Sequence, residues 1–150
     1  MQDLNFPQYE FKFQKKDDKI LIFDEVRKKY LVLTPEEWVR QNLIKFLIHE
    51  KQVPMGLIAI EKGLKVNTLT KRTDILVYRK DGQPGLLVEC KAPTVKITQD
   101  VFEQIARYNM SLQVPLLLVS NGLNHYCCKV DFEKGVYSFL KDIPTYENIF

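Results

Sequence analysis

The chain has few of the residues that build disulfide frameworks and structural metal sites. It contains three cysteines and two histidines, and no cysteine pair has the Cys-x-x-Cys spacing of zinc sites. The two histidines, His49 and His125, are isolated in the sequence. We therefore expect Cys90, Cys127 and Cys128 to be reduced side chains in or beside the core, with neither disulfide bonds nor a structural zinc site.

Long apolar runs and leader-like segments are also missing. No apolar run approaches the roughly 18 residues of a membrane span, and residues 1–5 have neither a basic nor an apolar leader region. We expect a cytoplasmic protein with no membrane partner. The sequence has no Gly-rich phosphate-binding loop or other motor motif, and no recognisable base-reading motif that would predict a recognition site.

The bulk composition is that of an ordinary globular domain. The 150 residues are 45% hydrophobic and 27% charged, with no internal repeat or long linker, so we expect residues 1–150 to form one domain. The net charge of +3 is modest, but basic residues gather at Lys15-Lys16, Arg27 to Lys29, and Lys62 to Arg72. Two interpretations stay open: a rim that attracts phosphates, or solvated faces and loops.

A strong helix start lies at Thr34. Its hydroxyl can cap a helix, Pro35 suits the first helical position, and Glu37 completes a capping box. The apolar spacing that follows predicts a helix to about His49 or Glu50.

The remaining periodicity predicts a mixed α/β fold. Alternation at Tyr9, Phe11 and Phe13, followed by the apolar run 20–23, predicts short strands or an extended arm within residues 1–24. Further strands are expected at 57–66, 73–78, 85–90, 114–119, 125–130 and 136–140, with a second helix from Thr98 to about Leu112. This order predicts an α/β sandwich with a mixed central sheet flanked by helices.

Two neighbouring strands carry charges where apolar residues are expected. Glu89 and Lys91 lie two positions apart, so they share one face of their strand, and Asp74 interrupts the preceding apolar strand. A two-residue loop at Asp81-Gly82 would place Asp74 opposite Glu89, whereas a four-residue loop would place it opposite Lys91. Either loop puts all three on one face, and an odd loop without a bulge would not.

Two carboxylates on one sheet face repel each other, and a hard divalent cation resolves that repulsion. Mg²⁺ takes one or two carboxylates and keeps several waters. The neighbouring lysine can position or deprotonate a metal-bound water, or neutralise charge on a phosphate. The alternative is a cross-strand salt bridge of Asp74 or Glu89 with Lys91.

Asp74, a short connection, and Glu89-Cys90-Lys91 resemble the PD-(D/E)XK nuclease pattern, with Thr73 where the family name has proline. Longer blocks resemble the N-terminal nuclease domain of type I restriction enzyme motor (R) subunits, in its short stand-alone bacterial version. They are 34–41, 71–77, 89–93, 104–109 and 120–122. The resemblance implies a restriction-endonuclease-like sandwich and a Mg²⁺-dependent endonuclease that hydrolyses DNA, with Mn²⁺ as a substitute.

The resemblance also implies roles for individual residues. Asp74 and Glu89 match the metal-binding acids, the carbonyl of Cys90 completes the site, and Lys91 matches the catalytic lysine. Glu37 matches a further acid on the first helix, with Glu36 as its competitor.

Four more residues are candidates around this centre. Gln104 and Tyr108 match a QxxxY element that could hold a phosphate or orient the lysine, and they share one face of a helix. Arg40 and Arg72 are candidate DNA contacts, with ordinary surface arginine as the alternative. The partners implied are DNA, a motor or specificity subunit, and a second copy of the chain. A non-catalytic or partner-dependent nucleic-acid-binding module on the same fold remains the alternative function, and an RNA substrate is a third possibility.

Overall fold

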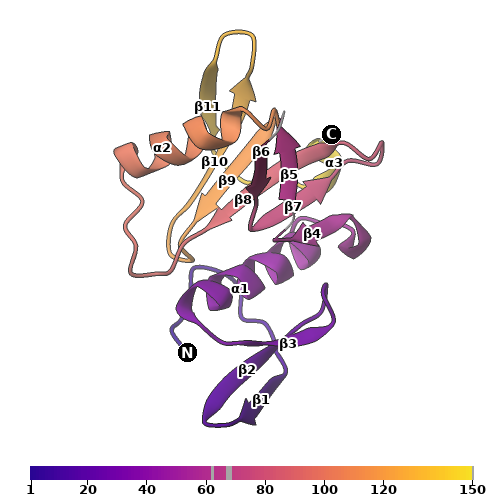
Figure 1. Cartoon of the computed structure of the whole chain (residues 1–150), viewed down its shortest axis with the longest axis vertical. Helices are drawn as coiled ribbons and strands as arrows, with labels where there is room; N and C mark the ends of the chain where they lie inside the picture. The colour runs from indigo at the N-terminus through magenta and orange to yellow at the C-terminus, as the bar shows by residue number, and fades with distance from the viewer. Residues whose placement is uncertain (62, 67–68, 150) are drawn as a thin grey trace.

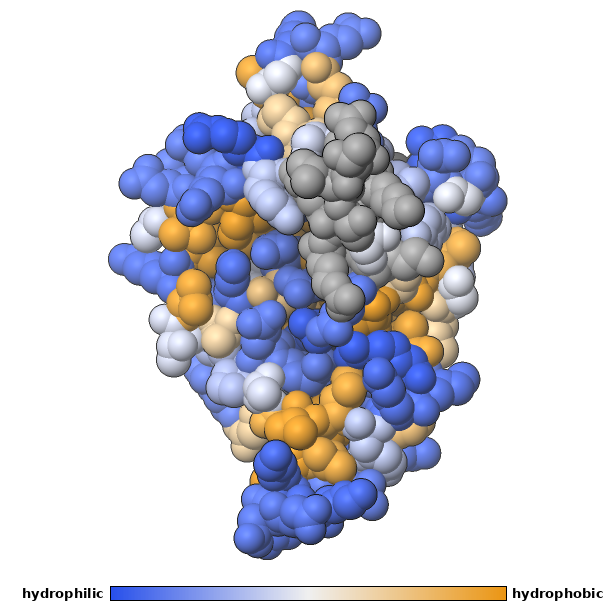
Figure 2. All heavy atoms as spheres, in the orientation of Figure 1, coloured by the Kyte–Doolittle hydropathy of each residue, from blue (hydrophilic) through white to orange (hydrophobic). Residues whose placement is uncertain are grey.

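The computed structural model describes residues 1–61, 63–66 and 69–149, and for residues 64–66, 69–72 and 149 it describes the backbone only. The elements are β1 (Phe13–Lys16), β2 (Lys19–Asp24), β3 (Lys29–Val32), α1 (Pro35–His49), the 3₁₀ turn η1 (Met55–Leu57), β4 (Ile58–Ile60), β5 (Gly63–Val66), β6 (Leu69–Arg72), β7 (Ile75–Tyr78), β8 (Pro84–Cys90), α2 (Gln99–Met110), β9 (Leu116–Ser120), β10 (His125–Asp131), β11 (Val136–Leu140) and α3 (Tyr146–Ile149). Figure 1 shows their arrangement, and Figure 2 shows the surface from the same side. Within the described ranges no helix combines the length and the apolar character needed to cross a membrane.

A six-stranded mixed sheet forms the centre, in the order β11-β10-β9-β8-β7-β4. Among the described strands only β8 and β9 pair in parallel, and α2 lies in the connection between them, as a parallel pair requires a crossover. The other neighbours pair antiparallel. The predicted mixed α/β fold is confirmed.

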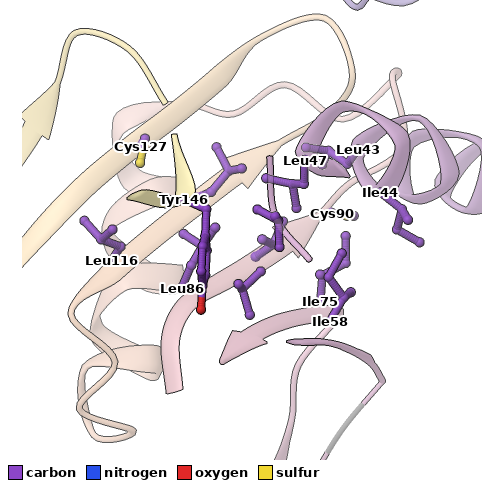
Figure 3. Close-up of a cluster of buried hydrophobic side chains, with 14 of the residues drawn as sticks. Leu43, Ile44, Leu47, Ile58, Ile75, Leu86, Cys90, Leu116, Cys127 and Tyr146 are labelled. Atoms are coloured by element: carbon purple, nitrogen blue, oxygen red, sulfur yellow. The ribbon is translucent and has the colours of Figure 1, made fainter. Parts of the chain in front are cut away.

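The two faces of this sheet are covered by different helices, so the sheet is the middle of three layers (Figure 1). On one face, Leu43 and Leu47 of α1 pack with Ile75 and Val88, and Figure 3 shows this cluster. On the other face, the apolar side of α2 packs against alternate residues of the same strands, which are Leu76 and Leu87 of β7 and β8 and Val119 of β9. Each fully buried side chain of this size stabilises the fold by about 1.5–3 kcal/mol.

Helix α1 begins and ends as its sequence predicts. The Thr34 hydroxyl accepts a hydrogen bond of 3.0 Å from the Glu37 N–H, Pro35 occupies the first helical position, and the helix ends at His49. The reciprocal half of the predicted capping box does not form. The Thr34 N–H donates to the Val32 carbonyl instead, because the Glu37 carboxylate is held by Arg40 and Gln41.

The expected strand 57–66 is wrong in its extent. It consists of η1, β4 and β5, and β4 and β5 belong to different sheets. The break lies at Glu61, whose φ of 51° ends the extended run and whose N–H donates to the Asp74 carbonyl at 3.0 Å. Strands β3 and β6 and helix α3 were not predicted, and each of them has only four residues.

The β7–β8 hairpin has a loop of neither of the two lengths considered from the sequence. Ile75 pairs with Val88, but after a bulge Tyr78 pairs with Pro84. The Gly82 N–H donates to the Arg79 carbonyl, and Gly82 has a φ of +86°, as in a three-residue hairpin loop. The loop is therefore odd and the bulge restores the register, so Asp74 comes opposite Glu89, as the two-residue loop would also have placed it.

Residues 1–24 supply both an extended segment and strands. The segment before β1 runs across the molecule, where the Asn5 N–H donates to the Gly122 carbonyl at 2.8 Å. There Leu4 and Phe6 pack against the α1 side of the core. Strands β1, β2 and β3 then form a separate antiparallel sheet beside α1.

Candidate active site

Strands β7 and β8 bring Asp74 and Glu89 together at one end of the hairpin. Asp74 precedes β7 by one residue, opposite Glu89 in the register set by the Ile75–Val88 pair. The Cys90 N–H donates to Asp74 Oδ2 at 2.6 Å. This bond fixes the carboxylate at the end of β8, where Glu89 also lies.

Lys91 completes the predicted group of three. Its Nζ lies 3.7 Å from Glu89 Oε1, and its N–H donates to the Ser120 carbonyl at 2.8 Å, which continues the β8–β9 pairing. A salt bridge with Lys91 thus forms, but with Glu89, two residues away along the same chain segment, and not across strands as the alternative had it. Val88 and Cys90 point to the α1 side of the sheet, so Glu89 and Lys91 leave it on the α2 side.

The carboxyl group of Glu89 is strongly perturbed. Burial, and after it the negative charge of Asp74, raise its pKa to about 7, against the opposing effect of Lys91. The negative charges of Glu89 and Asp74 are only partly balanced by Lys91 at this position. A divalent cation between the two acids would supply that charge.

The first turn of α1 presents two acids with different surroundings. Glu36 is about half exposed; burial, and then the charge of Asp74, raise its pKa, while Arg40 and Lys91 lower it. Glu37 is 8% exposed, and its oxygens lie 2.9 Å from Arg40 and 3.0 Å from Gln41. The structure therefore places Glu36 where its charge interacts with Asp74 and Lys91. Glu37 instead belongs to a buried network with Arg40 and Gln41.

Arg40 lies among acids and not on the outer surface where a phosphate contact was expected. It is 5% exposed, and its Nη2 lies 3.3 Å from Asp74 Oδ1 and 3.6 Å from Glu36. Its Nη1 lies 2.9 Å from Glu37 and 3.1 Å from Glu61. The guanidinium thus orients Asp74. The side chain of Arg72, the other candidate DNA contact, lies outside the described residues.

Gln104 and Tyr108 lie on the helix that covers the Glu89 side of the sheet. The buried side of α2 consists of Phe102, Ile105, Ala106 and Asn109. Gln104 is exposed. Tyr108 is 51% exposed. Their predicted role at a phosphate stays a prediction.

Two residues of the charged network were not predicted. Glu61 has its Oε2 3.5 Å from Arg27 Nη1 and its Oε1 3.1 Å from Arg40. Arg27 also holds Asp24 at 2.8 Å and Glu37 at 3.6 Å. A charge directly after the apolar residues 57–60 was a signal for Glu61, but only the packing of the β2–β3 connection against α1 reveals Arg27.

The donor set fits a small, oxygen-preferring cation with few protein ligands. Among the described residues no group of three or more Asp, Glu, His or Cys side chains is placed to hold a metal. Two carboxylates and the Cys90 carbonyl remain, and Mg²⁺ needs only one or two carboxylates because it keeps its waters. Each Asp74 oxygen has one partner, Arg40 or the Cys90 N–H, and a carboxylate oxygen can accept further contacts.

Comparisons with known proteins agree with this picture at the level of the family. Residues 35–144 match the family model described as the type I restriction enzyme R protein N terminus (HSDR_N). No curated protein matches the chain. Among solved structures, a fragment assigned to an HsdR subunit of a type I restriction enzyme from Vibrio vulnificus YJ016 is similar, at 20% identity and a TM-score of 0.48.

That match covers 71% of this chain and 22% of the other chain. The chain therefore spans about a fifth of the length of the protein that it resembles. The family match covers α1, the β7–β8 hairpin and the acids Glu36, Asp74 and Glu89. The chain belongs to the family of type I restriction enzyme R protein N-terminal domains.

Proposed function

We propose that the chain is a Mg²⁺-dependent nuclease domain of a restriction system, which hydrolyses phosphodiester bonds of DNA. The observation that carries the proposal is the grouping of Asp74, Glu89 and Lys91 at the end of the β7–β8 hairpin. Membership in the R protein family supports a role in restriction.

Each residue of the group has a task that follows from its position. Asp74 and Glu89 would hold the cation, with Mn²⁺ as a substitute, and the Cys90 carbonyl is the third oxygen. The bound cation would stabilise negative charge on the phosphate and lower the pKa of a bound water. Lys91 would orient the attacking water or neutralise charge on the phosphate, while Arg40 holds Asp74 in place.

The partners proposed are DNA and the other subunits of a restriction system. A second candidate function is DNA binding without cleavage, or cleavage only with a partner subunit. One observation favours it: Asp74 is already engaged by Arg40 and by the Cys90 N–H, so a cation would have to share its oxygens.

A cleavage assay tests the proposal. Supercoiled, linear and single-stranded DNA are each incubated with Mg²⁺ or Mn²⁺ and the wild-type chain, beside Lys91→Ala purified in the same way. Lys80→Ala, an exposed lysine in the hairpin loop, is the matched control. The proposal predicts a loss of at least about a hundredfold for Lys91→Ala only, since a group acting on transition-state charge contributes about 3 kcal/mol or more. Equal activity of wild type and Lys91→Ala would contradict it.

A further inference from the structure

The sheet formed by β1, β2 and β3 has one face whose side chains are mostly exposed. It lies within residues 13–32, before the region 35–144 that matches the family. Its inner face turns toward α1, where Ile22 and Asp24 are fully buried. Because side chains alternate along strands, the residues between these positions point away from α1.

The register identifies the members of this outer face. Gln14 pairs with Leu21 and Leu21 with Val32, while Phe23 pairs with Tyr30. Lys12 joins the Phe23 row, since its carbonyl accepts from the Phe23 N–H at 2.9 Å and its Nζ lies 5.7 Å from the centre of that ring. The outer face is Lys12, Gln14, Lys16, Lys19, Leu21, Phe23, Tyr30 and Val32.

The charge of the outer face has a single sign. Its three lysines are exposed, and none of its eight residues is an acid. Lys16 and Lys19 are direct register partners, and like charges placed opposite each other destabilise a strand pair. An anion bound over the hairpin would remove that cost. The acids Asp17 and Asp18 occupy the turn, where both have positive φ. In Figure 2 the lowest part of the molecule, where Figure 1 draws β1 and β2, is hydrophilic, and a hydrophobic patch lies directly above it.

The aromatic rings on the same face decide between two forms of nucleic acid. A single strand is held largely by bases that stack on exposed ring faces. Phe23 meets Tyr30 edge-on at 5.1 Å and carries Lys12 over its ring, so its ring is already engaged. Lys16 and Lys19, which do not lie over this ring, remain as contacts to phosphates, which fits the backbone of a duplex.

The sheet is also tied to the candidate active site. The β2–β3 connection carries Arg27, whose guanidinium contacts Glu37 at 3.6 Å and Glu61 at 3.5 Å. Arg40 links the same two acids to Asp74. A duplex held on the sheet would therefore lie on an element that is linked to Asp74 through Glu37, Glu61 and Arg40.

We propose that the outer face of the β1–β3 sheet binds the phosphate backbone of duplex DNA. The inference rests on the proposed function only in taking DNA as the substrate. It assigns a binding surface outside the family-matched residues, and this surface would work without reading base sequence.

The test is binding of a fluorescently labelled DNA duplex, followed by anisotropy in EDTA between about 50 and 200 mM salt. The variant Lys12→Gln/Lys16→Gln/Lys19→Gln is compared with Lys80→Gln/Lys134→Gln/Lys141→Gln, which removes the same charge from exposed lysines elsewhere. We expect the outer-face variant to weaken binding about tenfold or more, and to lower the salt slope by roughly 2–3, at about 0.9 for each phosphate contact. The control should change both values much less.

Three results would overturn the proposal. They are wild-type binding by the outer-face variant, an equal loss in both variants, and tighter outer-face-dependent binding of a single strand than of the duplex. Circular dichroism of both variants confirms that they fold. Because no divalent metal is present, the result is independent of whether Asp74 and Glu89 support cleavage. A failed cleavage assay and a failed binding assay can thus be told apart.

Discussion

Arg40 Nη2 lies 3.3 Å from Asp74 Oδ1, and the guanidinium that makes this contact is almost fully buried. The same group contacts Glu36, Glu37 and Glu61. One buried cation thus joins helix α1, the end of β4 and the start of β7. The candidate metal ligand Asp74 is positioned by tertiary structure and not by the hairpin alone.

Replacing this arginine should destabilise the whole domain. In Arg40→Gln the buried carboxylate of Glu37 loses its closest cation, and breaking a buried ion pair costs about 3–5 kcal/mol. Urea unfolding measures the change in the free energy of unfolding. Arg79→Gln is the control, since the Arg79–Asp81 pair is about half exposed and contributes only about 0–1 kcal/mol. Similar losses in the two variants would contradict a structural role for Arg40.

Replacing Glu36 should affect function, whereas replacing its neighbour Glu37 should affect stability. Glu36→Gln keeps the shape but removes a charge that faces Asp74 and Lys91, so we expect altered cleavage or metal affinity with a stability change within about 0.5 kcal/mol. Glu37→Gln removes the nearest of the acidic partners of Arg40 and should destabilise the fold by about 1–3 kcal/mol. Unfolding and cleavage are measured on both. The reverse pattern would make Glu37 the functional acid, as the sequence had suggested.

Much of this site follows from the sequence because its pattern is local. Alternation along β7 and β8 suffices to place Glu89 and Lys91 on one face, and the cap at Thr34 sets the start of α1. The bulge that restores the register after an odd loop is not visible in the sequence, because a bulge leaves no fixed residue pattern. Likewise, Arg27 and Glu61 join the charged network around Arg40 only through packing between distant segments.

Histidine 125 should make stability depend on pH. Its Nδ1 lies 2.7 Å from Ser120 Oγ and its Nε2 lies 2.9 Å from the Asn5 carbonyl oxygen, and burial lowers its pKa below the usual 6.5. The unfolded chain therefore binds a proton first as the pH falls, so this contribution to stability is complete above about 6.5. It is then lost as the pH falls toward the lower folded pKa.

The measurement is the free energy of unfolding from pH 8 to pH 5, for wild type and His125→Gln. We expect wild type to lose stability below about pH 6.5 and the variant to show a shallower loss over the same range. Identical slopes would contradict the assignment of this pH dependence to His125.

A side chain at position 122 should destabilise the fold more than one at position 82. Its φ is +86°, and a Cβ placed there would lie 2.8 Å from Leu4 Cδ2 and 3.0 Å from Val39 Cγ2. Gly82 has the same φ, but nothing lies within 4 Å of its would-be Cβ. Gly82→Ala should therefore cost only the backbone strain of about 1–2 kcal/mol. Gly122→Ala should cost about 1–3 kcal/mol more, from overpacking. Equal losses in thermal or urea unfolding would show that Leu4 moves aside freely.

Binding of Mg²⁺ and Mn²⁺ measured by titration calorimetry tests the pairing of Asp74 and Glu89 most directly, because it requires no DNA and no partner. Wild type, Asp74→Asn, Glu89→Gln and the exposed control Asp142→Asn are compared at neutral pH. We predict one binding event in wild type and Asp142→Asn, and its loss in both Asp74→Asn and Glu89→Gln. Binding that persists unchanged in Asp74→Asn, or no binding to wild type at millimolar metal, would contradict a metal site between the two acids.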